Sequence, residues 1–178
     1  MDRASLELVV SLTSLTRDRF DDVVEVLRSQ GLTRPKCTMR LDDFEYRDLG
    51  EAPEVAFDRC LAEGALDLFM EMWVDWNGGP VRLSLNFDFE GTGFMLSLES
   101  VYIYEREAVL EPRLRCFFAL SREIARVLEP LYGIVGAEGF IPSELQPGEV
   151  ERFGLQPFSM SILDEEALEQ VRHYYAGG

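Results

Sequence analysis

The sequence predicts an α+β fold, with a single antiparallel or mixed sheet of about five to seven strands and helices packed mainly on one face. Residues 66–104 alternate apolar and polar side chains through two glycine-containing turns, which is typical of three consecutive antiparallel strands. Other segments, such as 16–31 and 53–64, instead repeat apolar residues at helical spacing. Nothing along the 178 residues marks a linker, so we expect a single domain over residues 1–178.

The predicted central strands have one apolar and one polar face. In the first strand the even-numbered residues from Leu66 to Trp76 are apolar. The odd-numbered residues combine acids with large aromatic side chains: Asp67, Phe69, Glu71, Trp73 and Asp75. A reversal at residues 77–80 should place Asp88 of the second strand on the same face. Large aromatics ringed by charge are typical of protein interfaces, so we interpret these six residues as a partner-binding surface.

The segments before the central strands alternate between strand and helix patterns. Residues 5–13 and 37–41 each read as a strand. A helix between them can begin at Thr16 or Asp18 and end before Gly31. The polar, acidic residues 42–53 predict an exposed loop that leads into a helix from Pro53 to Gly64.

The alternation changes phase late in the third central strand. Beyond Ser100 we expect either a bulge near Glu99 or a strand that turns Tyr102 and Tyr104 inward. Pro112 should then open the longest helix, whose apolar side, including Phe117 and Phe118, should cover the dry face of the sheet.

The last quarter of the chain predicts a strand, a long loop and a final helix. Residues 132–140 read as a glycine-rich strand, and 141–156 as a surface loop. A short strand over 158–163 should precede a helix that Asp164 caps, with the only histidine, His173, in its last turn.

Charge is the strongest compositional signal, since 17 basic residues face 33 acidic ones and the formal net charge is −16. This balance argues against nucleic acid as a ligand, because binding a polyphosphate requires a basic patch. Lys36 is the only lysine. Acid excess with few lysines fits a saline or GC-rich source, and it fits equally a surface complementary to a basic protein.

Several functional classes lack their sequence signature. No apolar run reaches the length of a membrane helix, so we expect a soluble, cytoplasmic protein without membrane contact. The three cysteines are widely spaced, which argues against a disulfide framework or a zinc site. A single histidine rules out a histidine cluster, and no phosphate-binding loop or dinucleotide fingerprint is present. We therefore expect no cofactor and assign no catalytic residue or metal ligand.

The remaining chemistry is that of carboxylates and arginines. Glu138 lies among small and apolar neighbours, an environment that would raise the pKa of its carboxyl group. Arg122 and Arg126 belong to the most basic helix of the chain. Together these three residues are the candidates for a small ligand, and the acidic strand face is the candidate for an acid/base or metal site.

The sequence favours a non-enzymatic protein that acts by binding another protein, for example as an inhibitor or immunity-type protein for a basic toxin or nuclease. The alternative is a small enzyme, or a binder of a small ligand or metal, that uses carboxylates. A homodimer formed through a sheet edge is a third reading that the sequence does not separate from the first.

Overall fold

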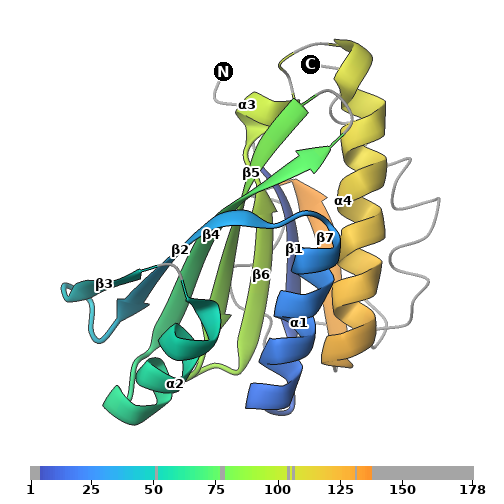
Figure 1. Cartoon of the computed structure of the whole chain (residues 1–178). Helices are drawn as coiled ribbons and strands as arrows, with labels where there is room; N and C mark the ends of the chain where they lie inside the picture. The colour runs from blue at the N-terminus through green and yellow to red at the C-terminus, as the bar shows by residue number, and fades with distance from the viewer. Residues whose placement is uncertain are drawn as a thin grey trace.

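The computed structural model describes residues 5–50, 52–76, 79–103, 105, 107–130 and 132–137 (Figure 1). Seven strands form one sheet in the order β3-β2-β4-β5-β6-β1-β7, and each neighbouring pair is antiparallel. The strands are β1 (Leu6–Ser11), β2 (Thr33–Arg40), β3 (Tyr46–Gly50), β4 (Asp67–Trp76), β5 (Gly79–Asp88), β6 (Gly93–Leu98) and β7 (Tyr132–Ala137). The helices are α1 (Arg17–Ser29), α2 (Pro53–Glu63), α3 (Ser100–Ile103) and α4 (Glu107–Leu128). The predicted α+β class is confirmed, and all the pairings seen are antiparallel.

Three helices cover one face of the sheet. Helices α1 and α4 lie side by side, and α2 packs beside α1 and against β2 and β4 (Figure 1). The Phe20 ring of α1 stacks on Phe57 of α2 at 4.3 Å and meets the edge of Phe87 of β5 at 5.0 Å. Phe117 and Phe118 of α4 are fully buried in the same core, as the helical spacing predicts. Aromatic rings therefore join the helix layer to the centre of the sheet.

Strands β4, β5 and β6 form the predicted antiparallel meander. In the first hairpin Asp67 pairs with Asp88 and Trp76 with Gly79, and Leu98 of β6 pairs with Leu83 of β5. The even-numbered residues of β4 are buried beneath the helices, whereas the odd-numbered ones point to the opposite side. This alternation determines which side chains lie on the face of the sheet that α1, α2 and α4 do not cover.

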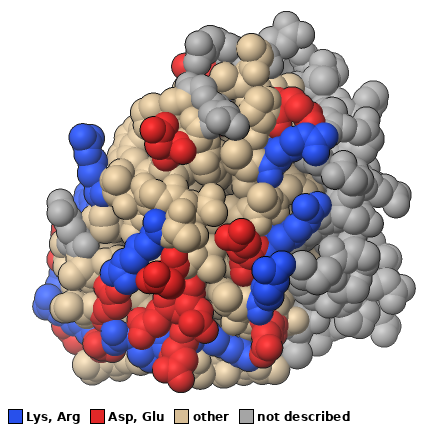
Figure 2. Space-filling model, turned by 45° about the vertical axis from the view of Figure 1, so that its right-hand side comes forward, with Lys and Arg blue, Asp and Glu red and all other residues tan. Residues whose placement is uncertain are grey.

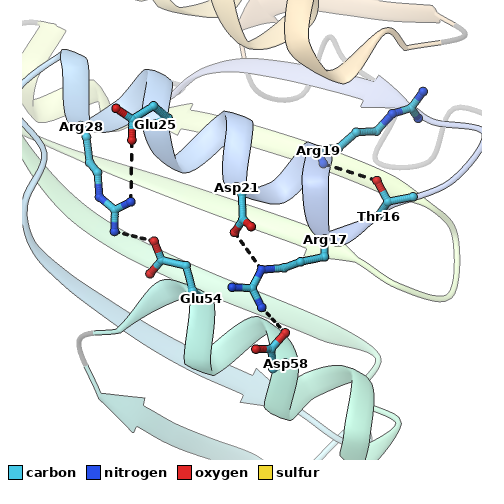
Figure 3. Close-up of polar contacts among 8 residues, drawn as sticks. All are labelled: Thr16, Arg17, Arg19, Asp21, Glu25, Arg28, Glu54 and Asp58. Atoms are coloured by element: carbon cyan, nitrogen blue, oxygen red, sulfur yellow. Dashed lines mark hydrogen bonds and ion pairs between the residues drawn. The ribbon is translucent and has the colours of Figure 1, made fainter.

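Ion pairs join α1 to its neighbours (Figure 3). Thr16 caps α1, because its hydroxyl oxygen accepts the backbone N–H of Arg19 at 3.3 Å. Arg17 pairs with Asp21 on its own helix and with Asp58 of α2. Arg28 at the other end reaches Glu54 of α2, so two arginines hold the two helices together.

The loop predicted over residues 42–53 is wrong, because it contains strand β3. Asp42 Oδ1 accepts the N–H groups of Phe44 and Glu45, both at 2.8 Å, and this turn brings the chain back along β2. An edge strand is hydrogen-bonded on one side only and needs no apolar alternation to form. Leu49 is the apolar residue of β3 that packs against the core.

The extension of the third strand beyond Ser100 is also wrong. Strand β6 ends at Leu98, and Ser100–Ile103 forms one helical turn, α3. The phase change arises because this turn buries Ile103 and leaves Tyr102 half-buried. Helix α4 then begins before Pro112, which lies inside it rather than at its start. The missing proline N–H removes one hydrogen bond close to the helix beginning.

Residues 141–156, the strand predicted over 158–163 and the final helix lie outside the described residues. Within the described part of the chain, none of the helices combines the length and apolar character needed to cross a membrane.

Candidate protein-binding face

The side of the sheet opposite α1, α2 and α4 is here called the second face. Strand alternation and cross-strand pairing determine which side chains belong to it. Its central members on strands β2 to β6 are Lys36, Thr38, Arg40, Tyr46, Asp48, Asp67, Phe69, Glu71, Trp73, Asp75, Arg82, Ser84, Asn86, Asp88, Met95 and Ser97. The acidic and aromatic residues predicted from β4 therefore share a face with Asp88.

An open groove of about 490 Å³ lies on the second face, and it is here called the aromatic groove. Its lining residues come from β2, β3, β4 and β5: Lys36, Thr38, Tyr46, Phe69, Met70, Glu71, Ser84 and Leu85. The rings of Tyr46 and Phe69 lie 6.2 Å apart with an interplanar angle of 38°. Tyr46 is 57 % exposed and Phe69 is half-buried, so apolar surface is presented to solvent between polar side chains.

Two arginine–carboxylate pairs lie on either side of the aromatic groove. At one end, Arg40 Nε donates to Asp67 Oδ2 at 2.5 Å, and Asn86 Nδ2 donates to Asp67 Oδ1 at 3.1 Å. At the other, Arg82 Nε donates to Glu99 Oε1 at 2.9 Å. Hydrogen bonds to these carboxylates raise the pKa of Arg40 and of Arg82. Each arginine is neutralised locally, so neither leaves a free positive charge on the face.

Glu71 and Asp75 are the exposed acids of β4 on this face. Glu71 also lines the aromatic groove. Lys36 pairs with Glu71 in register across β2 and β4. Among the described residues, no ion pair joins Glu71 or Asp75 to a basic side chain. Around α1 and α2, by contrast, acids and bases are paired, and Figure 2 shows blue and red side chains lying next to one another.

The six residues predicted as partner-binding differ in how far they can reach a partner. Phe69, Glu71 and Asp75 meet solvent, whereas Asp67 is 2 % exposed and is held by Arg40. Asp88 Oδ1 accepts the N–H of Gly91 at 2.7 Å and so supports the turn between β5 and β6.

Trp73 is partly covered by its own chain. Its ring meets that of Tyr102 of α3 edge to face at 6.0 Å and 85°, and it is half-buried. Trp73 is thus held in a fixed orientation at one end of the second face, with part of its ring accessible.

Sequence reasoning missed Tyr46, which lines the aromatic groove from β3. Its signal was the presence of Phe44 and Tyr46 within the acidic stretch 42–48, a composition unusual for a plain solvent loop. Thr38 and Ser84, which also line the groove, carry no signal of their own because small polar residues occur on any solvated strand.

Of the three predicted ligand candidates, the structure describes only the two arginines. Arg122 is half-buried and Arg126 is exposed, one turn apart on α4, on the helix-covered side of the sheet. Glu138 lies outside the described residues. Within the part of the chain that the structure describes, no three histidine, cysteine or carboxylate side chains are grouped so as to hold a metal ion.

Comparison with known proteins identifies no family. No protein-family model matches the chain, and no curated protein matches it. A similar solved structure is a crystal structure of the toxic C-terminal tip of CdiA from Pseudomonas aeruginosa in complex with immune protein. The matching chain is 14 % identical with a TM-score of 0.47, and the alignment covers 82 % of this chain and 98 % of that one. At this level of similarity we infer nothing from it about function.

Proposed function

We propose that this chain is a non-enzymatic protein that binds a basic protein partner through the second face. An inhibitor or immunity-type protein that neutralises a basic toxin or nuclease is the concrete form of this function. The observation that carries the proposal is the aromatic groove, where Phe69 and Tyr46 present apolar surface to solvent beside the exposed Glu71.

The aromatic groove has the composition expected of an interface centre. Aromatic side chains that lose water on binding contribute most of the affinity in many interfaces, and polar residues around them exclude solvent. Phe69 is held by strand β4 and by the Tyr46 ring, so little side-chain entropy remains to be lost when a partner packs against it. Thr38 and Ser84 at its edge offer hydroxyl groups for hydrogen bonds to a partner.

Charge selects the class of partner. The chain carries −16 overall, and Glu71 and Asp75 add exposed acids to the second face itself. A basic protein approaching this face would be steered by the whole charge and would meet two carboxylates that no ion pair among the described residues holds. A partner with net negative charge would be repelled on approach.

The experiment that tests the proposal is a calorimetric titration of this protein with purified basic proteins encoded by the neighbouring genes. We expect saturable binding by one of them that weakens as salt is raised, because steering and exposed charge pairs are screened. The variant Glu71→Gln/Asp75→Asn removes two exposed charges that would face a basic partner, so it should weaken that binding by roughly tenfold. A tenfold change in affinity corresponds to about 1.4 kcal/mol.

A matched variant separates the second face from net charge. Asp18→Asn/Asp22→Asn removes the same two charges from exposed positions on α1, on the helix-covered side. Binding should stay close to that of the unmodified protein. Equal weakening by the two double variants, or binding that is indifferent to salt, would contradict the proposal.

A further inference from the structure

Strand β3 forms one edge of the sheet, next to the aromatic groove. β2 bonds to one side of it, and no described strand pairs with the other. Leu41 N donates to Glu45 O at 3.0 Å, which fixes the phase of the ladder between β2 and β3. Hydrogen-bonded pairs alternate along an antiparallel ladder, so Arg47 bonds towards β2, whereas Tyr46 and Asp48 direct their N–H and C=O groups outward.

The outer edge of β3 lacks two of the common protections against pairing. Many natural edges carry proline or an outward lysine, and β3, a strand of five residues, contains neither. Its one basic residue, Arg47, pairs with Glu63 of α2 and with Glu45, so its charge is already compensated. The edge is therefore available for backbone hydrogen bonds, and the exposed carboxylates of Asp42, Asp43 and Asp48 lie in it or beside it.

The hairpin that ends in β3 also presents exposed aromatic side chains. Phe44, at the tip, is 93 % exposed, and Tyr46 follows it on the groove side. The tip is ordered by the two backbone bonds that Asp42 accepts. Asp43 and Glu45 flank Phe44, and both are exposed, Asp43 at 3.7 Å from Arg40 and Glu45 at 2.7 Å from Arg47. A preorganised edge of this kind loses little entropy when a partner binds it.

We propose that the partner adds an extended, basic segment as an eighth strand on the outer edge of β3. This inference rests on the proposed function and specifies how the partner is engaged. Alternate side chains of the added strand would lie beside Tyr46 on the second face, where Asp48 also points. Its arginines or lysines would meet the acids around Phe44.

Charge distinguishes this occupant from a second copy of the chain. Pairing β3 with itself would bring two molecules of charge −16 together and place the acids of one hairpin against those of the other. An extended basic segment reverses the sign of each of these contacts. A homodimer would show itself as a doubling of mass in light scattering without any added peptide.

A synthetic peptide tests the inference directly. The probe is an acetylated hexapeptide of alternating arginine and valine, compared with the same peptide N-methylated at every residue, which keeps its charge but removes the backbone N–H donors of both edges. The unmodified peptide should bind roughly tenfold more tightly, because each lost hydrogen bond weakens binding several-fold. It should also slow hydrogen exchange at the Tyr46 and Asp48 amides. Equal binding of both peptides, or no binding of either, would overturn the inference.

Two variants at one position test the same edge within the protein. Asp48→Pro removes an outward N–H, whereas Asp48→Ala removes the same side chain and keeps that N–H. Peptide binding should fall further, by roughly tenfold, in Asp48→Pro than in Asp48→Ala. Thermal melting shows whether each variant folds. If Asp48→Pro does not fold, the hydrogen-exchange measurement on the unmodified protein decides whether the peptide pairs with β3.

The two proposals fail in different ways. Should the added strand be wrong but the proposed function right, Asp48→Pro and Asp48→Ala would bind alike, while loss of Glu71 and Asp75 would still weaken binding of the protein partner. Should the proposed function be wrong, binding of the neighbouring basic proteins would respond neither to salt nor to those two acids.

Discussion

The rings of Tyr46 and Phe69 lie 6.2 Å apart although their strands, β3 and β4, are not neighbours. Strand β2 runs between them, and its Thr38 pairs with Phe69 in register. The two aromatic side chains therefore reach over a small polar residue and close the aromatic groove from both sides. The contact between Tyr46 and Phe69 therefore links the edge strand β3 to the centre of the second face.

We predict that Arg40→Met lowers the free energy of unfolding by about 2–4 kcal/mol, because it leaves a buried carboxylate without its cation. Asp67 is 2 % exposed and would keep only the Asn86 amide. Urea denaturation followed by circular dichroism measures the change.

Two further variants serve as controls for this ion pair. Arg82→Met breaks a pair whose side chains are 35 % and 34 % exposed, so its cost should stay below about 1 kcal/mol. Arg40→Met/Asp67→Leu removes both charges and should recover much of the stability lost in the single variant. Equal costs for Arg40→Met and Arg82→Met would show that burial of Asp67 is not what makes the first pair important.

We predict that the carboxyl group of Asp42 titrates below its usual range. The backbone N–H groups of Phe44 and Glu45 hold the pKa of Asp42 down, because they bond to its ionised form. Since the folded pKa is the lower one, the stabilisation of the turn is fully present above the ordinary carboxyl pKa and is lost as pH falls through the folded value.

Carbon-13 NMR titration of the Asp42 side chain checks this prediction. The amide chemical shifts of Phe44 and Glu45 should change with pH at the same midpoint. In Asp42→Ala this pH-dependent change should disappear. A midpoint within or above the ordinary carboxyl range would contradict the geometry of the turn.

We predict that two of the three cysteines are unreactive in the folded protein. Burial raises the pKa of Cys37 and of Cys60 to about 12, and both side chains are inaccessible. Their thiolate fraction near neutral pH is therefore negligible, whereas Cys116 is half-buried. Ellman's reagent should label one thiol in the native protein and three after unfolding. Cys116→Ser should abolish the native labelling, and native labelling of Cys37 would contradict the packing of β2 against α2.

Much of the fold could be predicted because local patterns were strong. Strands β4 and β5 show a period-two alternation, and the segment around Phe20 shows a helical repeat. Both patterns arise because an element of this kind must turn an apolar side to the core. Strand β3 lacked such a pattern, because an edge strand is held mainly by hydrogen bonds to β2. The start of α4 was missed because Pro112 resembles a helix beginning, although the helix tolerates it one turn later.

The aromatic groove was only partly predictable. Phe69 and Glu71 stood out on β4, but their proximity to Tyr46 depends on the strand order β3-β2-β4, which no local pattern specifies. The roles of Asp67 and Asp88 were equally hidden. A buried carboxylate held by an arginine, or one that supports a turn, has the same sequence signature as one that faces a partner.

The central claim is tested most directly by comparing two variants, Phe69→Ala and Leu61→Ala. The quantity measured is the affinity of each variant for the basic partner that the titration identifies. Leu61 is 53 % exposed on α2, on the other side of the sheet, so the second variant controls for loss of an accessible apolar side chain. With both variants folded, Phe69→Ala should weaken binding by about tenfold or more, and Leu61→Ala should leave it unchanged. Equal affinities for the two variants would contradict binding through the second face.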